Sequence, residues 1–121
     1  MNDENKVFVN PEGYLEVVVV GEQTAESFQD IWKVAEPLLG VMKVENKRLL
    51  ALLDLTFQTG FSVRSDKAAM ELLEQIPYEK IAMFNVPHRE VTKSIILATG
   101  KSDNTKIFDS RQEAVNWLLT E

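Results

Sequence analysis

The sequence predicts a single α/β domain over residues 1–121, built on a mainly parallel β-sheet with an N-terminal hairpin. Strand-like apolar runs alternate with amphipathic helical patterns in the order ββαβαβαβα, and this alternation is typical of right-handed crossovers between parallel strands. The run at residues 49–55 is apolar except for Asp54, and hydroxyl and glycine positions follow it. That change is typical of a buried strand whose carboxyl end meets a helix start. The length of 121 residues suits one core rather than two.

A β-hairpin is predicted at the start of the chain. Residues 6–10 and 14–20 are strand-like, and residues 10–13 between them place Pro and Gly where a tight reversal needs them. Gly21 is expected to end the second strand.

The first helix is predicted to begin after Thr24, because a threonine side chain can accept a hydrogen bond from a helix-start amide. Apolar residues then recur at helical spacing on one face; they are Phe28, Ile31, Trp32, Ala35, Leu38 and Leu39. Pro37 is expected to kink this helix or end it early, which leaves residues 40–47 as a connection.

Three further strands and helices complete the pattern. A second amphipathic helix is predicted over residues 63–76, where Pro77 stops it, and a short apolar strand over residues 80–85. The third helix is predicted over residues 87–99, with Gly100 as its exit.

The last strand and helix follow a short turn. Residues 105–108 are predicted to form the strand. Ser110 and Glu113 have the spacing of a capping box, in which each residue bonds the other's backbone amide, so they predict the start of the terminal helix.

Composition excludes several classes of function. The formal net charge of −6 and the absence of a Lys/Arg cluster argue against nucleic-acid binding. The chain has no cysteine, which excludes disulfides and thiolate chemistry, and no apolar run approaches the length of a membrane span. We therefore expect a cytoplasmic protein with no membrane insertion and no cofactor or metal.

Catalytic groups are sparse. Asp54 is the one carboxylate placed directly at a buried strand end, where it could either cap nearby backbone amides or take part in function. Asp109, at another strand end, is its only candidate partner for acid–base work. His88 is the only histidine, and no Gly-x-Ser-x-Gly elbow accompanies it. The sequence thus predicts a protein that is not an enzyme.

Two segments resemble a known family. Leu53-Asp-Leu-Thr-Phe-Gln-Thr-Gly-Phe resembles the strand-to-helix junction of the STAS domain superfamily. Lys106-Ile-Phe-Asp-Ser-Arg-Gln-Glu-Ala-Val-Asn-Trp-Leu118 resembles the closing strand and helix of its SpoIIAA-like (STAS/SEC14-type) branch. The order of elements agrees with that branch over nearly the whole chain.

The resemblance implies a regulatory role. In the anti-sigma-factor antagonists of this superfamily, a strand ends in Asp-x-Ser, and an Asp-Ser-Ser-Gly turn presents a phosphorylatable serine at a helix start. Here Asp54-Leu-Thr matches the first element, while Gln58-Thr-Gly replaces the second, so that Thr59 alone could take the phosphoacceptor position. The expected interaction or phosphoacceptor surface spans residues 56–65; its candidates are Asp54, Thr56, Thr59, Gly60 and Ser62. Gly60 there could be a plain turn glycine or allow the close approach of a ligand.

Two kinds of partner follow from these observations. The first is an unidentified protein that binds this surface. The alternative, which the SEC14-type resemblance implies, is a small apolar or lipid-like ligand in a pocket. Homodimerisation is also expected, because residues 17–20, 49–53 and 81–84 are apolar on both strand faces and so need cover on both sides.

Overall fold

The computed structural model describes residues 5–60, 71, 78–98, 100 and 103–120 of the chain. The described elements, in chain order, are β1 (Lys6–Asn10), β2 (Tyr14–Glu22), α1 (Ala25–Val44), β3 (Leu50–Gly60), β4 (Lys80–Phe84), α3 (Arg89–Ala98), β5 (Thr105–Phe108) and α4 (Arg111–Leu119). The predicted helix at residues 63–76 lies outside the described residues except for Glu71, which is helical.

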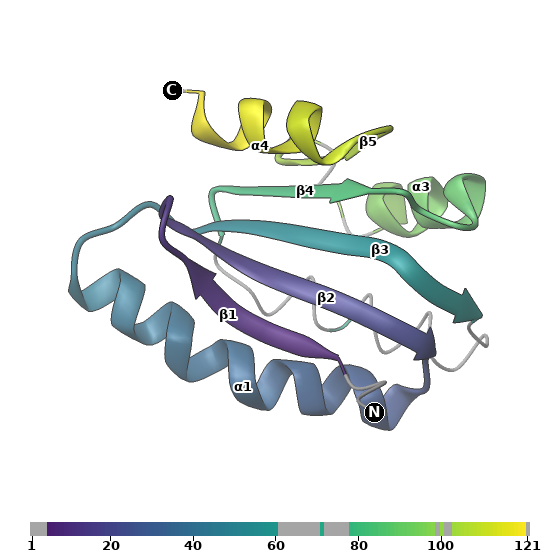
Figure 1. Ribbon diagram of the computed structural model, residues 1–121, viewed down its shortest axis with the longest axis horizontal. Helices are drawn as coiled ribbons and strands as arrows, with labels where there is room; N and C mark the ends of the chain where they lie inside the picture. Colours follow the sequence, from purple (N-terminus) through teal and green to yellow (C-terminus); the bar gives the residue numbers. More distant parts are fainter. Residues whose placement is uncertain (1–4, 61–70, 72–77, 99, 101–102, 121) are drawn as a thin grey trace.

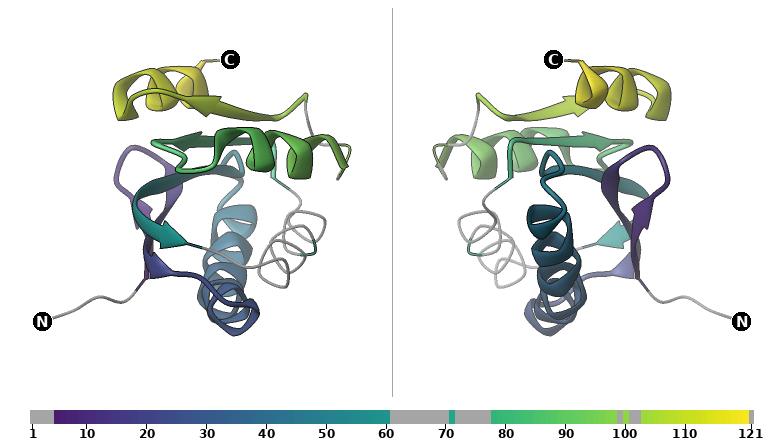
Figure 2. Two further views of the ribbon diagram at one scale, coloured as in Figure 1. Left: turned by 90° about the vertical axis from the view of Figure 1, so that its right-hand side faces the viewer. Right: turned by 90° about the vertical axis from the view of Figure 1, so that its left-hand side faces the viewer.

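The described strands form one sheet in the order β1-β2-β3-β4-β5. The β1 strand is antiparallel to β2, and every later neighbour is parallel, as predicted. The strands lie in a row from β1 to β5 with α1 along the side of β1 and β2 (Figure 1). Helix α4 lies on the opposite face of the sheet, over its β4–β5 end (Figure 2).

Each face of the sheet supports its own apolar core. The face toward α1 and α3 carries the larger core, in which Leu15, Val17 and Val19 of β2 pack with Ala51 and Met83 of the next strands. The opposite face carries a smaller core beneath α4; its buried members are Tyr14, Leu50, Leu52, Ala82, Phe84, Ala114 and Leu118. The alternation of strand side chains between the two faces explains why these strands are apolar on both sides.

The cap predicted for the first helix is confirmed, and the capping box predicted for the last helix is confirmed in part. The Thr24 side chain accepts a hydrogen bond from the Ser27 amide at 3.1 Å, and the Ser27 hydroxyl accepts one from the Thr24 amide at 2.8 Å. At α4 the Ser110 hydroxyl accepts a hydrogen bond from the Glu113 amide at 3.3 Å. The Glu113 carboxylate bonds the Ser110 hydroxyl rather than its backbone, so this capping box is only half formed.

The prediction that Pro37 ends α1 early is wrong. The helix continues through Pro37 to Val44, and residues beyond the proline are among the best buried in the core. Leu39 is 5% exposed and Met42 is 1% exposed. A proline inside a helix costs about 3 kcal/mol, whereas burying two such side chains gains about 3–6 kcal/mol. Burial therefore offsets the missing hydrogen bond.

The β3 strand is longer than its apolar run predicts. The apolar pattern predicts an end near Leu55, yet the strand continues to Gly60 because its second half pairs with β2 beyond Val20. Strand β2 likewise runs through Gly21, which has a φ of +78°, to Glu22. The pairing shifts register twice along this stretch, so β3 carries one extra residue in each irregularity. The region expected to be a turn is therefore a bulged strand.

Candidate functional site

The candidate site lies at the end of the sheet where β3, β4 and β5 reach their carboxyl ends. In open α/β sheets this edge is where binding sites commonly lie. Helix α3 starts at the same end, as Figure 1 shows. The described residues among those that the sequence assigned to the site belong to β3, and Asn85 after β4 and Arg89 of α3 lie at the same end of the sheet.

Asp54 holds the backbone of the strand that follows it. Its Oδ1 accepts a hydrogen bond from the Thr56 amide at 3.0 Å. The expectation that Asp54 caps nearby amides is confirmed, but the capped amide belongs to the bulge of β3 rather than to a turn. Asp54 is half-buried and pairs with Val18 on one side and Phe84 on the other. This hydrogen bond is a structural contact.

Asn85 links the end of β4 to the neighbouring strand β3. It follows β4 directly and has a φ of +56°, a backbone conformation that asparagine adopts more readily than most residues. Its side-chain amide donates a hydrogen bond to Thr56 Oγ1 at 2.8 Å. We did not predict Asn85 as a site residue. The signal that could have found it is an asparagine placed immediately after a buried strand and before Val-Pro.

Phe57 is an exposed aromatic at this edge, and it too was absent from the predicted site. It is 57% exposed and pairs with Val20 immediately beyond the first register shift. The bulge places Leu55 and Thr56 together between the Val18 and Val20 pairings, and Leu55 is buried. An exposed phenylalanine in a paired strand is held in position by the sheet, although nothing covers half of its surface.

The remaining predicted residues have different positions. Thr59 is exposed and is the second-last residue of β3. Gly60 ends the strand; its carbonyl accepts a hydrogen bond from the Gln23 amide at 2.9 Å. A Cβ at Gly60 would lie 3.8 Å from Cγ of Glu22, an ordinary contact, so neither a turn nor close packing requires glycine there. Ser62, and the helix start expected near it, lie outside the described residues.

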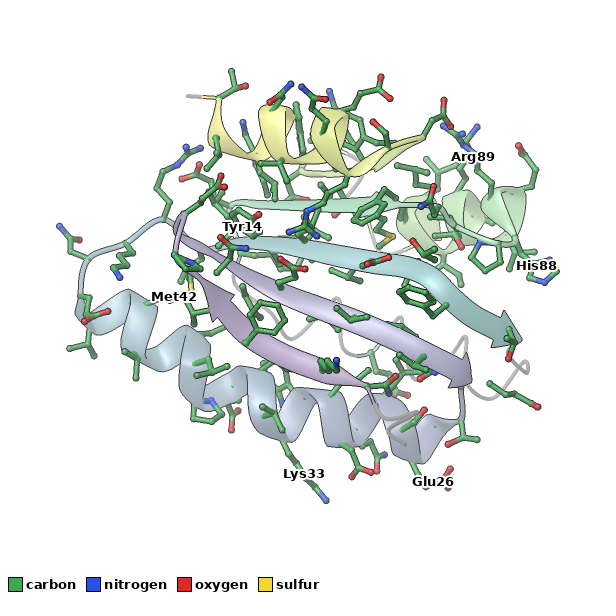
Figure 3. The ribbon with its side chains drawn as sticks, in the orientation of Figure 1. Tyr14, Glu26, Lys33, Met42, His88 and Arg89 are labelled. Carbon is green, nitrogen blue, oxygen red and sulfur yellow. The ribbon has the colours of Figure 1, made fainter. Side chains whose placement is uncertain are left out.

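The carboxylates do not form an acid–base pair. Asp109 forms an ion pair with Arg89 at the start of α3. Strand β4 lies between Asp54 and β5, which separates the two acids by two strand spacings, or about 10 Å. Arg89 is the first residue of α3 and His88 precedes it, and both lie at this end of the sheet (Figure 3). The proposed pairing of Asp54 with Asp109 is therefore wrong.

A groove lies beside this edge, between α3 and β5. Its volume is about 340 Å³, and its walls combine the apolar side chains of Ile96, Leu97 and Ile107 with Arg89 and Lys93. Leu97 is 69% exposed, so the groove is open to solvent along α3.

Neither a metal site nor a membrane span is found in the part of the chain that the structure describes. Within the described ranges, no three His, Asp or Glu side chains lie together as metal ligands do. None of the helices that the structure describes is both long enough and apolar enough to cross a membrane.

Comparison with known proteins identifies the fold. No protein-family model and no curated protein matches the sequence. Among solved structures, the chain is similar to an uncharacterized DUF3478-family protein with a SpoIIAA-like fold from Shewanella loihica PV-4. The TM-score is 0.67 and the identity 19%, over 94% of this chain and 91% of that one. It is also similar to the anti-sigma factor antagonist SpoIIAA in its unphosphorylated form. That TM-score is 0.58 and the identity 8%, over 93% and 94% of the two chains.

These likenesses show the fold of the chain. It is a SpoIIAA-like α/β fold, which confirms the fold predicted from the sequence and the SpoIIAA-like resemblance.

Proposed function

We propose that this chain is a non-enzymatic regulatory domain that binds a protein partner through the surface around residues 56–65. The observation that supports this most strongly is Phe57, an aromatic that is 57% exposed on a paired strand. Aromatic side chains are enriched among the residues that dominate binding energy at protein interfaces. A partner would cover Phe57 at a low cost in entropy, because the sheet already restricts the backbone.

The neighbouring hydrogen bonds support the same proposal. Asp54 accepts a hydrogen bond from the Thr56 amide within β3, and Asn85 at the end of β4 donates one to the Thr56 hydroxyl. Both the backbone and the side chain of the residue before Phe57 are therefore held in place. The likeness to an anti-sigma factor antagonist is consistent with a regulatory role for this fold. Thr59, exposed two residues beyond Phe57, is the proposed phosphoacceptor.

A photo-crosslinking experiment tests the proposal. A photoreactive phenylalanine analogue at position 57 should capture a specific protein in lysate of the source cells, whereas the analogue at Val44 should not. Val44 is the matched control, because it is 87% exposed and ends α1, whose C-terminal end lies at the opposite end of the sheet from the end of β3 (Figure 1). Identical products from the two positions, or none from position 57, would contradict the proposed surface.

The second candidate is binding of a small amphipathic ligand in the groove between α3 and β5. Its volume of about 340 Å³ lies within the usual range for ligand sites. The apolar walls suit an alkyl chain, and Arg89 and Lys93 suit an anionic head group. A fluorescent fatty acid should bind the wild type and fail to bind Leu97→Asp, while Val44→Asp should bind normally. Equal binding by Leu97→Asp would exclude the groove.

A further inference from the structure

The sheet face that carries α4 is covered only in part. Helix α4 packs over β3, β4 and β5, and its Arg111 reaches Tyr14 and Glu16 in the first half of β2. No described helix packs over β1 or the second half of β2 on that face. Figure 2 shows α4 at one end of the sheet, with the ribbon of β1 and β2 open on the same side. The side chains that share this face include Phe8, which is 38% exposed, and Val18 and Val20, which are half-buried. The same face also carries Lys6 and Asn10 of β1 and the buried Glu16 of β2, so its uncovered apolar surface consists of Phe8, Val18 and Val20.

Opposite charges stand on either side of this apolar surface. Lys6 of β1 is directly opposite Val18 of β2, and Val18 is directly opposite Asp54 of β3. Residues opposite one another in a sheet point to the same face. The open face therefore carries a row of three residues on three adjacent strands: the cation Lys6, then Val18, then the anion Asp54. Lys6 is exposed and Asp54 is half-buried.

We propose that this open face binds a second copy of the chain about a twofold axis that runs parallel to β2 and passes over Val18. A rotation of 180° about that axis reverses the order of the strands, but it leaves each residue at the same height along the strand direction. Val18 of one protomer then meets the partner's Val18, and Lys6 meets the partner's Asp54 on both sides. The row is self-complementary, as a closed twofold interface requires.

The charges select this axis over the alternative. A twofold axis running across the strands in the plane of the sheet would place Lys6 over the partner's Lys6 and Asp54 over the partner's Asp54. Like charges placed opposite each other at an interface are unfavourable. Two sheets packed face to face are about 10 Å apart, and a lysine and an aspartate that extend toward one another can meet across that gap.

Charge reversal with mixing tests both the face and the axis. Lys6→Glu alone would place a glutamate opposite the partner's Asp54, and Asp54→Lys alone would place a lysine opposite the partner's Lys6. Each single variant should therefore sediment as a monomer of 13.8 kDa. An equimolar mixture of the two should form a 1:1 heterodimer, because both cross-protomer contacts then join opposite charges. The double variant should dimerise as the wild type does.

Controls separate folding from association. Lys33→Glu reverses a charge on α1 that points away from the sheet (Figure 3), so it should leave the dimer intact. Val18→Asp should abolish the dimer in every background. Circular dichroism melting tests whether each variant is folded, including Asp54→Lys, which loses the hydrogen bond to the Thr56 amide.

Two results would overturn the inference. One is a wild-type chain that sediments only as a 13.8 kDa monomer at micromolar concentration. The other is a wild-type dimer that both single charge reversals leave unchanged, since the contact would then use another face. Phe57 lies on the same face, because it is directly opposite Val20, but it is not part of the row of Lys6, Val18 and Asp54. A failure of this test would therefore exclude the dimer without excluding a different protein partner at Phe57.

Discussion

Arg111 at the start of α4 binds Glu16 of β2 through a two-pronged ion pair, although the two residues are 95 positions apart in sequence. The distances are 2.9 Å from Nη1 to Oε2 and 2.7 Å from Nη2 to Oε1. The Glu16 side chain is 6% exposed and that of Arg111 is 44% exposed. Asn10 donates a further hydrogen bond to Oε1 at 3.1 Å. This pair ties the last helix to the N-terminal hairpin.

Removing Arg111 should destabilise the fold more than neutralising Glu16. Arg111→Ala leaves a buried carboxylate without its cation, and we expect a loss of about 3 kcal/mol in the free energy of unfolding. Glu16→Gln should cost about 1–2 kcal/mol, because an amide can still accept and Arg111 can reach water. Urea denaturation measures both. The control is Arg89→Ala, which breaks an exposed pair and should cost less than about 1 kcal/mol. Equal losses from all three variants would contradict this account.

Protonation of the Glu16 carboxylate should contribute to the loss of stability in acid. The hydrogen bonds from Arg111, and then that from Asn10, lower the pKa of the Glu16 carboxyl against the opposing effect of burial. A carboxyl group whose pKa is lower in the folded than in the unfolded state stabilises the fold at any pH above its unfolded-state pKa, which is about 4.3 for Glu. That stabilisation is lost as the pH falls through the lower, folded value.

Denaturation of wild type and Glu16→Gln at a series of pH values checks this sign. The difference in unfolding free energy between them should be largest at neutral pH and shrink below about pH 4.3. A difference that stays constant down to about pH 2 would show that the Glu16 carboxylate is not the group responsible.

Replacing Asn85 by alanine should destabilise the fold more than replacing it by glycine. Its φ of +56° is strained for alanine, and both substitutions remove the hydrogen bond to Thr56. We expect Asn85→Ala to cost about 2 kcal/mol and Asn85→Gly about 1 kcal/mol, with the difference due to the backbone. Thermal melting of the two variants distinguishes them. If glycine were the more harmful substitution, the left-handed conformation would not explain the choice of asparagine.

A charge at Thr59 should alter partner binding without altering the fold. Thr59 is exposed near the end of β3, so Thr59→Glu adds charge beside Phe57 at little cost in stability. Pull-downs with wild type, Thr59→Ala and Thr59→Glu should differ in the glutamate variant alone. The same partners recovered in equal amounts from all three would remove the phosphorylation hypothesis.

Much of the fold could be predicted because it follows from local patterns. The hairpin, the parallel strands and the cap at Thr24 depend on neighbouring residues, and the structure has them as expected. The extent of α1 could not be predicted, because it depends on the burial of Met42 by distant strands. The length of β3 was missed for a similar reason, since its second half is held by pairing with β2 rather than by its own apolar pattern.

The candidate site was predicted less well than the fold. Asp54 and Thr56 were found because they end an apolar run, and they do share a hydrogen bond. Asn85 is separated from Thr56 by 29 positions, and only the parallel pairing of β3 and β4 brings them together. The exposure of Phe57 follows from a register shift between β2 and β3, which the sequence around Phe57 does not predict.

The most direct test of the proposed binding surface is quantitative affinity capture with Phe57→Ala against Val44→Ala. Both substitutions remove exposed apolar side chains, so both proteins should melt close to wild type. If the surface around residues 56–65 binds a partner, Phe57→Ala should lose at least one protein that wild type and Val44→Ala both retain. Retention of every captured protein by a folded Phe57→Ala variant would contradict the proposal.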